Sequence, residues 1–274
     1  YNILVFEDDT HYPYNGYEHL IFPNINLSID SLFFVDDTNT FDQKITDGTN
    51  WDMVLYNSIC CGGSSSNFEL MSDYINDGGK LIYNNWAAGA FDNDNTLLEN
   101  LGVVVTDPFT TPINFEAEPS SYDHPIFNTP NQISNLYWND DNANFDGQYV
   151  SLINNSSALA VFEDYSDPAI ILNEDNNAFF NAFSFTQYLD NDNDFDGVSD
   201  IFELIENQIL FLLDSNNNFV LGDLNNDGEV NIYDIIILVS LVFDGEYNQS
   251  GDVNGDGILN IADCVLLVNL ILGN

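Results

Sequence analysis

Two copies of a twelve-residue acidic loop near the C-terminus constrain the fold of this chain most strongly. The copies begin at Asp223 and Asp252, 29 residues apart, and each runs into an apolar segment, 232–243 or 261–272. In both copies, positions 1, 3, 5, 9 and 12 carry oxygen-bearing side chains and position 6 is glycine. This spacing of oxygen ligands suits a hard cation, and the glycine permits the sharp turn of such a loop. The repeat therefore predicts a loop–helix unit, formed twice, around bound cations.

Two details separate this unit from a helix–loop–helix calcium sensor. Neither loop has a full helix before it, and position 12 is Asp in both copies where a sensor usually has Glu. In these features the segment 221–274 resembles a dockerin type I module, a small calcium-folded domain that plugs into a cohesin partner. The resemblance implies two Ca²⁺ sites, the first held by Asp223, Asn225, Asp227, Asn231, Asp234 and the carbonyl of Glu229, the second by Asp252, Asn254, Asp256, Asn260, Asp263 and the carbonyl of Ile258. The alternative is a pair of Asx-rich turns that cap two helices without metal.

The recognition face departs from the family pattern. Dockerins that bind cohesin usually carry a Ser-Thr-like pair at loop positions 10 and 11 and basic residues later in the helix. Here these positions are Ile232-Tyr233 and Ile261-Ala262, and neither helix has Lys or Arg. Both helices are apolar nearly all round, and a module of this size cannot bury them alone. We therefore expect it to dock on its own body, on an identical subunit or on a cohesin-like domain.

A third acidic segment, upstream of the repeat, fits the same spacing. The frame begins at Asp192, has glycine at position 6 and runs into the last helix expected before the repeat. Carboxylates this close together repel one another strongly unless a cation lies between them. The segment therefore predicts a third Ca²⁺ that ties this helix to its sheet, and the alternative is a solvated Asp/Asn loop. The expected ligands are Asp192, Asp194, Asp196, Asp200 and Glu203, with the carbonyl of Val198 at position 7.

The rest of the chain alternates apolar strands with helical segments. Such alternation predicts crossover units and an α/β fold with a mostly parallel sheet and flanking helices. We expect this domain to span 1–215, a short linker 216–220, and a small all-α calcium-binding module 221–274. The expected strands are 2–7, 31–35, 51–56, 80–83, 103–105, 149–153, 158–163, 169–172 and 178–185, and the expected helices are 17–22, 67–76, 95–101 and 199–213.

This first domain resembles the glutamine-amidotransferase-like (flavodoxin-like) α/β fold. The resemblance rests on the first strand with its acidic end, on W-D-M-V-L-Y at 51–56, on D-G-G-K-L-I-Y at 77–83 and on D-H-P-I-F at 123–127. Active relatives carry a nucleophilic Cys with a His partner at the turn after a central strand. Here Ala87 and Ala88 occupy that turn, so we assign no catalytic residue and expect no enzyme of this type.

Composition narrows the partners. The chain has 274 residues, with 45 Asp and Glu against two basic residues, and its net charge near −43 repels nucleic acid and anionic membranes. No stretch is long and apolar enough to span a membrane. A start at Tyr1 without Met and loops suited to millimolar calcium favour a secreted, extracellular protein. Three cysteines form no disulfide framework, and the state of Cys60 and Cys61 stays open, as does the use of the sequons at Asn26, Asn154, Asn155 and Asn248.

Two hypotheses from different classes follow. The first is a calcium-stabilised, non-enzymatic assembly protein whose terminal module docks on a partner; where that partner is another copy of the chain, the contact can build a filament or lattice. The second is a dockerin-bearing extracellular enzyme or carbohydrate-active accessory protein attached to a cohesin scaffold. Aromatic side chains could stack on sugar rings, but no motif points to a polysaccharide.

Overall fold

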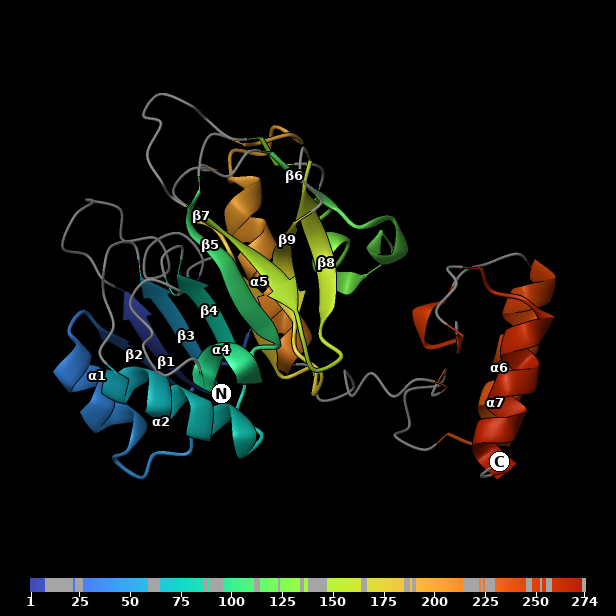
Figure 1. Ribbon diagram of the computed structural model, residues 1–274, viewed down its shortest axis with the longest axis horizontal. Coiled ribbons are helices and arrows are strands. Elements are labelled where there is room, and N and C mark those ends of the chain that lie inside the picture. Colours follow the sequence, from blue (N-terminus) through green and yellow to red (C-terminus); the bar gives the residue numbers. More distant parts are fainter. Residues whose placement is uncertain are drawn as a thin grey trace. The chain divides into compact units, whose positions relative to one another are not determined.

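The computed structural model resolves the chain into two compact units (Figure 1). The first comprises Tyr1–Ser121 and Pro125–Leu213, and the second comprises Tyr122–His124 and Asp214–Asn274. The structure describes residues 1–7, 22, 27–58, 65–85, 88, 96–110, 114–122, 124–133, 136–137, 147–163, 167–184, 188, 191–213, 222, 224, 230–244, 248–251, 253–254 and 258–272.

An eight-stranded sheet forms the centre of the first unit (Figure 1). Five neighbouring strands run parallel, from β2 to β10, and three more add antiparallel pairings at one edge. The fold is therefore α/β with a mostly parallel sheet. In spatial order the strands are β2 (Ser31–Val35), β1 (Asn2–Glu7), β3 (Met53–Ser58), β4 (Leu81–Asn85), β10 (Ala178–Asn181), β9 (Pro168–Leu172), β8 (Ser157–Phe162) and β6 (Phe115–Ala117).

Helix α1 connects the parallel strands β2 and β3, helix α2 connects β3 and β4, and the limits of both helices have local reasons. Asp37 begins α1 by accepting a hydrogen bond from the backbone N–H of Thr40 at 2.9 Å, as an N-cap residue does. Gly78, with φ of +88°, follows the end of α2 in the left-handed conformation that glycine adopts without strain. Among the described residues, the helices of this unit are α1 (Thr38–Ile45), α2 (Ser65–Asn76), α4 (Thr96–Asn100) and α5 (Asp200–Leu213), with short 3₁₀ turns at Pro119–Ser121 and Pro125–Phe127.

Strand β10 shows that helices cover both faces of the sheet. Phe180 stacks on Tyr83 of β4 with ring centroids 5.9 Å apart, and this row of rings continues through β3 to Phe41 of α1. Successive side chains of a strand point to opposite faces, and on the other face Phe179 meets Phe211 of α5 at 5.6 Å. The first unit thus has helices on both sides of its sheet, with α5 opposite α1.

One expected strand lies elsewhere. The segment 103–105 was expected to extend the parallel sheet, but β5 (Val103–Thr110) pairs with β7 (Gly147–Leu152) in a separate antiparallel sheet. The place beside β4 belongs to β10, which is fully buried. Val104 of β5 is 47% exposed, so this strand does not supply two apolar faces, as a central parallel strand must.

Other elements agree with the sequence within a few residues. Strands β1 and β2 have the expected limits, and β3, β4, β7, β8 and β9 are shifted by at most two residues at either end. The sequence missed α1 and β6, and it extended β10 too far. The expected helix 17–22 and the linker 216–220 fall outside the described residues, apart from Phe22.

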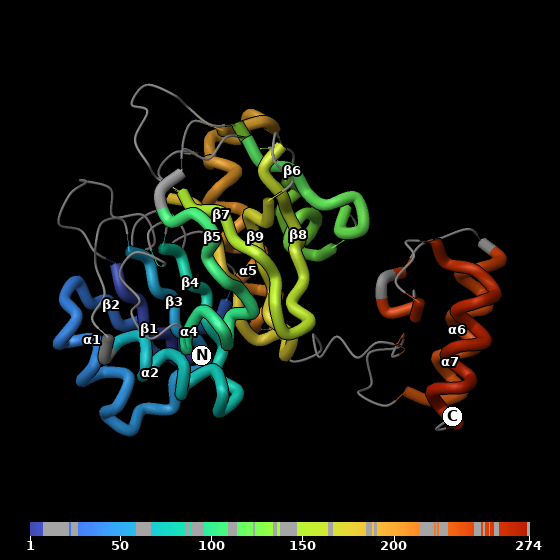
Figure 2. Tube along the Cα trace, viewed as in Figure 1, coloured from blue at the N-terminus to red at the C-terminus, as the bar shows by residue number. Residues whose placement is uncertain are grey.

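The second unit contains two helices, α6 (Ile232–Asp244) and α7 (Ile261–Leu272), and a 3₁₀ turn at Gln249–Gly251, all visible as red and orange tube in Figure 2. α6 and α7 pack against each other around a small core of Leu224, Leu238, Cys264 and Leu267. Within the described part of the chain, no helix combines the length and the apolar character needed to cross a bilayer.

Candidate metal centres

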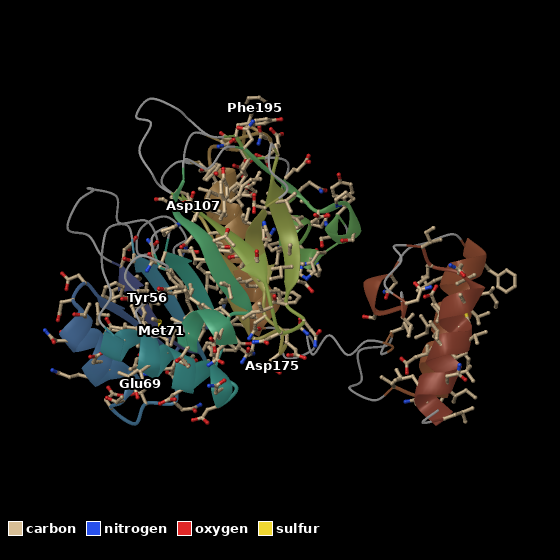
Figure 3. The ribbon with its side chains drawn as sticks, in the orientation of Figure 1. Tyr56, Glu69, Met71, Asp107, Asp175 and Phe195 are labelled. Atoms are coloured by element: carbon tan, nitrogen blue, oxygen red, sulfur yellow. The ribbon has the colours of Figure 1, made fainter. Side chains whose placement is uncertain are left out.

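The acidic loop before α5 lies wholly within the described residues, together with the first turn of this helix. α5 begins at Asp200, which is position 9 of the frame, and Glu203 therefore lies in its first turn. Figure 3 marks this end of the α/β domain by Phe195, a loop residue whose side chain is 88% exposed.

The loop and the helix bring five carboxylates together. Oxygens of Asp192, Asp194 and Asp200 lie within 4.8 Å of one another, and so do oxygens of Asp194, Asp196 and Glu203. Asp194 belongs to both groups, so the two groups form one continuous cluster. All five predicted carboxylate ligands therefore converge.

Hydrogen bonds within the loop fix its turn. The backbone N–H of Asp196 donates to Asp192 at 3.1 Å, and the N–H of Gly197 donates to the same carboxylate at 3.2 Å. The N–H of Val198 donates to Asp196 at 2.7 Å. Gly197 has φ of +93°, a conformation that glycine adopts at little cost, as expected for position 6. Phe195 also has positive φ, at +63°.

Two of the five acids are buried. Asp200 is 1% exposed and accepts hydrogen bonds from the backbone N–H of Asn193, at 3.0 Å, and from its side-chain amide. Glu203 is 6% exposed, and its Oε2 has no hydrogen-bond partner. Burial, followed by the nearby charges of Asp194, Asp196, Asp200 and Glu206, raises the pKa of Glu203 to about 7.

Asn191, just before the loop, joins it to the edge of the sheet. Its side chain accepts a hydrogen bond from the backbone N–H of Tyr137 and donates one to the Tyr137 carbonyl, both at 2.8 Å. Its own carbonyl accepts the N–H of Asp200 at 2.8 Å. The neighbouring Leu136 bridges to Phe115 of β6, so the start of α5 is linked to that edge strand. The sequence reasoning missed Asn191, since a lone Asn in an Asn/Asp-rich segment carries no distinguishing signal.

In the two repeated loops, the residues at positions 9 and 12 have equivalent roles. Asp234 and Asp263 are fully buried, and each accepts the backbone N–H of the position 9 residue of its loop, at 2.8 Å from Asn231 and 2.9 Å from Asn260. A second N–H reaches each carboxylate, from Leu224 at 2.8 Å and Asn254 at 3.3 Å.

These bonds place both carboxylates inside the loop, where a position 12 ligand must lie. The side chains of Asn231 and Asn260 also cap the two helices, because they accept the backbone N–H groups of Tyr233 and Ala262 at 2.9 Å and 2.8 Å.

The structure describes half of the twelve ligands predicted for the two repeated loops. The described ligands are Asn231, Asp234, Asn254, Ile258, Asn260 and Asp263, whereas Asp223, Asn225, Asp227, Glu229, Asp252 and Asp256 lie outside the described residues.

Comparison with protein families decides what this unit is. Residues 221–272 match the dockerin type I domain. Dockerin type I domains bind calcium, which makes Ca²⁺ a plausible cofactor, and they imply a protein partner, typically a cohesin. The matched segment begins at Leu221, the predicted first residue of the module, and contains both repeated acidic loops.

The α/β domain is similar to known structures in fold alone. The cytoplasmic protein STM3548 from Salmonella typhimurium has a TM-score of 0.52 at 13% identity, over 77% of this chain and 98% of that chain. The mmIFT52 N-terminal domain has 0.48 at 14% identity, over 77% and 97%. A putative ThuA-like protein from Parabacteroides merdae has 0.43 at 8% identity, over 76% and 88%. A comparison with curated proteins returned no match.

None of these comparisons identifies the α/β domain as amidotransferase-like, so that resemblance stays a prediction. Ala88, one of the two residues in place of the nucleophile, is fully buried, while Ala87, Cys60 and Cys61 lie outside the described residues. Cys264 is a free, buried cysteine in the core of the dockerin domain.

The sequence also missed a buried amide network in the α/β domain. The side-chain amide of Asn181 in β10 donates to Asn84 at 2.5 Å and to Gln208 of α5 at 3.0 Å, and Gln208 donates back to Asn181 at 3.1 Å. All three side chains are at least 98% buried, with Asn84 2% exposed and the other two 0%. The available signal was a pair of neutral polar residues, Asn207 and Gln208, within a helix rich in apolar residues. The network links α5 to strands β4 and β10 of the sheet.

Proposed function

We propose that the chain is a secreted docking protein whose dockerin domain anchors the α/β domain to a cohesin-like partner. The contact would be apolar, in place of the polar and basic residues with which dockerins usually bind cohesin. The observation that carries this proposal is the apolar surface of α6 and α7. The match to the dockerin type I domain supports a protein partner.

The same stripe of apolar side chains occurs on both helices. Ile232, Ile236 and Phe243 of α6 are 65%, 63% and 85% exposed. The residues 29 positions later, on α7, are Ile261, Val265 and Leu272, which are 70%, 56% and 66% exposed. Each stripe follows the spacing of one helix face. We call these two sets the apolar stripes.

The apolar stripes suit a protein surface as partner. Exposed apolar side chains that gather on one face mark interaction sites, whereas a single exposed apolar residue is ordinary and needs no explanation. Full burial of one such side chain contributes roughly 1.5 to 3 kcal/mol. Neither helix contains Lys or Arg, so the attraction does not depend on basic residues. We therefore expect binding that changes little with salt concentration once calcium is saturating.

In this proposal the α/β domain is the load that the dockerin domain carries. Its fold alone does not specify an activity. The hypothesis of a carbohydrate-active enzyme or accessory protein needs a substrate site, and no described residue cluster has been assigned to one.

Self-association is the second candidate, because the two apolar stripes are equivalent. A partner that covers one stripe leaves the other available, and a second copy of the chain could use it to extend a filament or lattice. The net charge of −43 opposes this arrangement, since like-charged chains repel, and cations would have to screen it.

The two candidates are separated by a binding experiment on the full chain. A cohesin domain from the same source is titrated by calorimetry in calcium, and the chain alone is followed by light scattering in calcium and then in chelator. The first proposal expects a one-to-one complex and a monomeric free chain. Calcium-dependent growth of particles without cohesin would favour self-association instead.

Variants of the apolar stripes test the surface itself. Ile236→Lys and Val265→Lys lie at equivalent positions, so each alone leaves one stripe intact, and together they should weaken binding by tenfold or more. Val104→Lys is the control for each single substitution, because it adds the same single charge at an exposed apolar position of the α/β domain. Unchanged cohesin affinity in the double variant would refute the proposed surface.

A further inference from the structure

We propose that the acidic loop before α5 binds one Ca²⁺ ion in the α/β domain, at a site separate from the dockerin domain. The inference does not rest on docking, since the loop at 192–203 lies outside the matched residues 221–272. Four features of the loop support the site: its donor set, an unsatisfied buried oxygen, the lack of an ion pair with any described basic group, and its position in the fold.

The donor set fits one calcium ion. Ca²⁺ takes six to eight oxygen ligands at about 2.3 to 2.6 Å, so oxygens on opposite sides of one ion lie roughly 5 Å apart. Both groups of carboxylate oxygens fall within 4.8 Å, and they share Asp194. Five carboxylates and the carbonyl of Val198 follow the order of ligands along a twelve-residue calcium loop.

A second observation points to a missing ligand. The Oε2 atom of Glu203 is buried without a hydrogen-bond partner, and the residue is 6% exposed. An oxygen of the same carboxylate lies in one group with Asp194 and Asp196, so the unsatisfied oxygen is on a side chain of the cluster. A buried carboxylate oxygen without a partner is costly in a folded protein, and a cation at the cluster would satisfy it.

Between described residues, no ion pair involves this loop: the N-terminal amine pairs with Asp30 at 3.1 Å and Lys44 pairs with Asp47 at 3.2 Å. Mg²⁺ fits the loop less well, because it demands octahedral geometry at about 2.0 to 2.1 Å and keeps several waters. The number of carboxylates in the cluster therefore favours Ca²⁺, since Mg²⁺ is usually bound by one or two.

The position of the loop indicates what the ion does. It would join the first turn of α5 to the loop, and Asn191 continues this link to Tyr137 and the edge strand β6. Calcium would then stabilise the packing of α5 on the sheet of the α/β domain. This role differs from the folding of the dockerin domain around its own ions.

The test counts calcium bound to the full chain. Wild type and Asp194→Asn are dialysed to equilibrium against calcium, and bound calcium per chain is measured. We expect the variant to bind one Ca²⁺ fewer than the wild type. Asp175→Asn is the control, because Asp175 is an exposed acid at the opposite end of the domain in Figure 3 and should bind as many ions as the wild type. Equal counts in wild type and Asp194→Asn would overturn the proposal.

A second variant keeps the test valid if Asp194→Asn folds poorly. Glu203→Gln preserves the shape of the side chain and removes one repelling charge. We expect it to melt at a higher temperature than the wild type in chelator, and to gain less than the wild type when calcium is added. A calcium-induced shift as large as that of the wild type, or an equal shift with Mg²⁺ in the wild type, would overturn the assignment of a calcium site.

Discussion

The small core of the dockerin domain gives the sharpest quantitative prediction. Leu267 of α7 is fully buried, in a core cluster that it shares with Leu224, Leu238 and Cys264. Leu267→Ala removes several methyl and methylene groups from this centre. We predict that the domain then needs more calcium to fold.

The magnitude follows from cavity energetics and size. Buried Leu→Ala substitutions cost about 3 kcal/mol, with a range of roughly 2 to 5. A domain of 52 residues is stable by roughly 3 to 8 kcal/mol at about 0.05 to 0.15 kcal/mol per residue. The substitution therefore removes a large share of the stability, and bound calcium must offset the loss.

Calcium linkage turns this loss into a measurable shift. Each bound ion adds about 1.4 kcal/mol of stability for every tenfold rise in free calcium above its Kd. With two ions, a loss of about 3 kcal/mol raises the calcium midpoint of folding about tenfold. With one ion, the rise exceeds about a hundredfold. The size of the shift therefore also tests the predicted pair of sites.

Labelling of Cys264 measures the midpoint in the full chain. Its thiol is buried in the same core, so it reacts only when the domain opens, and mass spectrometry locates the label in the peptide that contains it. Leu272→Ala is the matched control, since that side chain is 66% exposed and should leave the midpoint nearly unchanged. Equal midpoints for wild type and Leu267→Ala would refute the reasoning.

Three further predictions concern single residues. Gly222→Ala should destabilise the dockerin domain by about 1 to 3 kcal/mol in the same labelling assay. The reason is that Gly222 has φ of +94° and an added Cβ would lie 2.6 Å from Leu267 Cδ1. A calcium midpoint of folding equal to that of the wild type would contradict this prediction. Burial lowers the pKa of His124 to about 4, so its imidazole signals in NMR should stay constant from about pH 7.5 to 5.5, where an ordinary histidine titrates near 6.5. Its contribution to stability is present above about pH 6.5 and is lost as the pH falls towards 4; a midpoint near 6.5 would contradict the burial. Asn181→Ala should cost about 1 to 3 kcal/mol in urea unfolding, since it leaves the buried amide of Gln208 without its partner, and a loss below about 0.5 kcal/mol would show that the network relaxes.

The sequence predicted those parts of the candidate sites that depend on local spacing. A calcium loop takes its ligands from twelve consecutive residues, so the frames at Asp192, Asp223 and Asp252 could be read directly. The helices after them followed from their apolar pattern, and α5 begins within one residue of its expected start. What the spacing could not provide was the burial of Glu203 and its unsatisfied oxygen, because these depend on residues that pack against α5 from elsewhere in the chain.

By itself, the sequence determined the α/β class, the positions of most strands and the repeat matched by the dockerin type I domain, because each is written in residues close together along the chain. Only the tertiary structure decided the neighbours. β10 lies beside β4, although 92 residues separate Asn85 from Ala178, and β5 lies in another sheet despite its position in the chain. The physical reason is that a central parallel strand must bury both faces, and Phe179 and Phe180 of β10 do so against α5 and β4, whereas β5 leaves Val104 exposed.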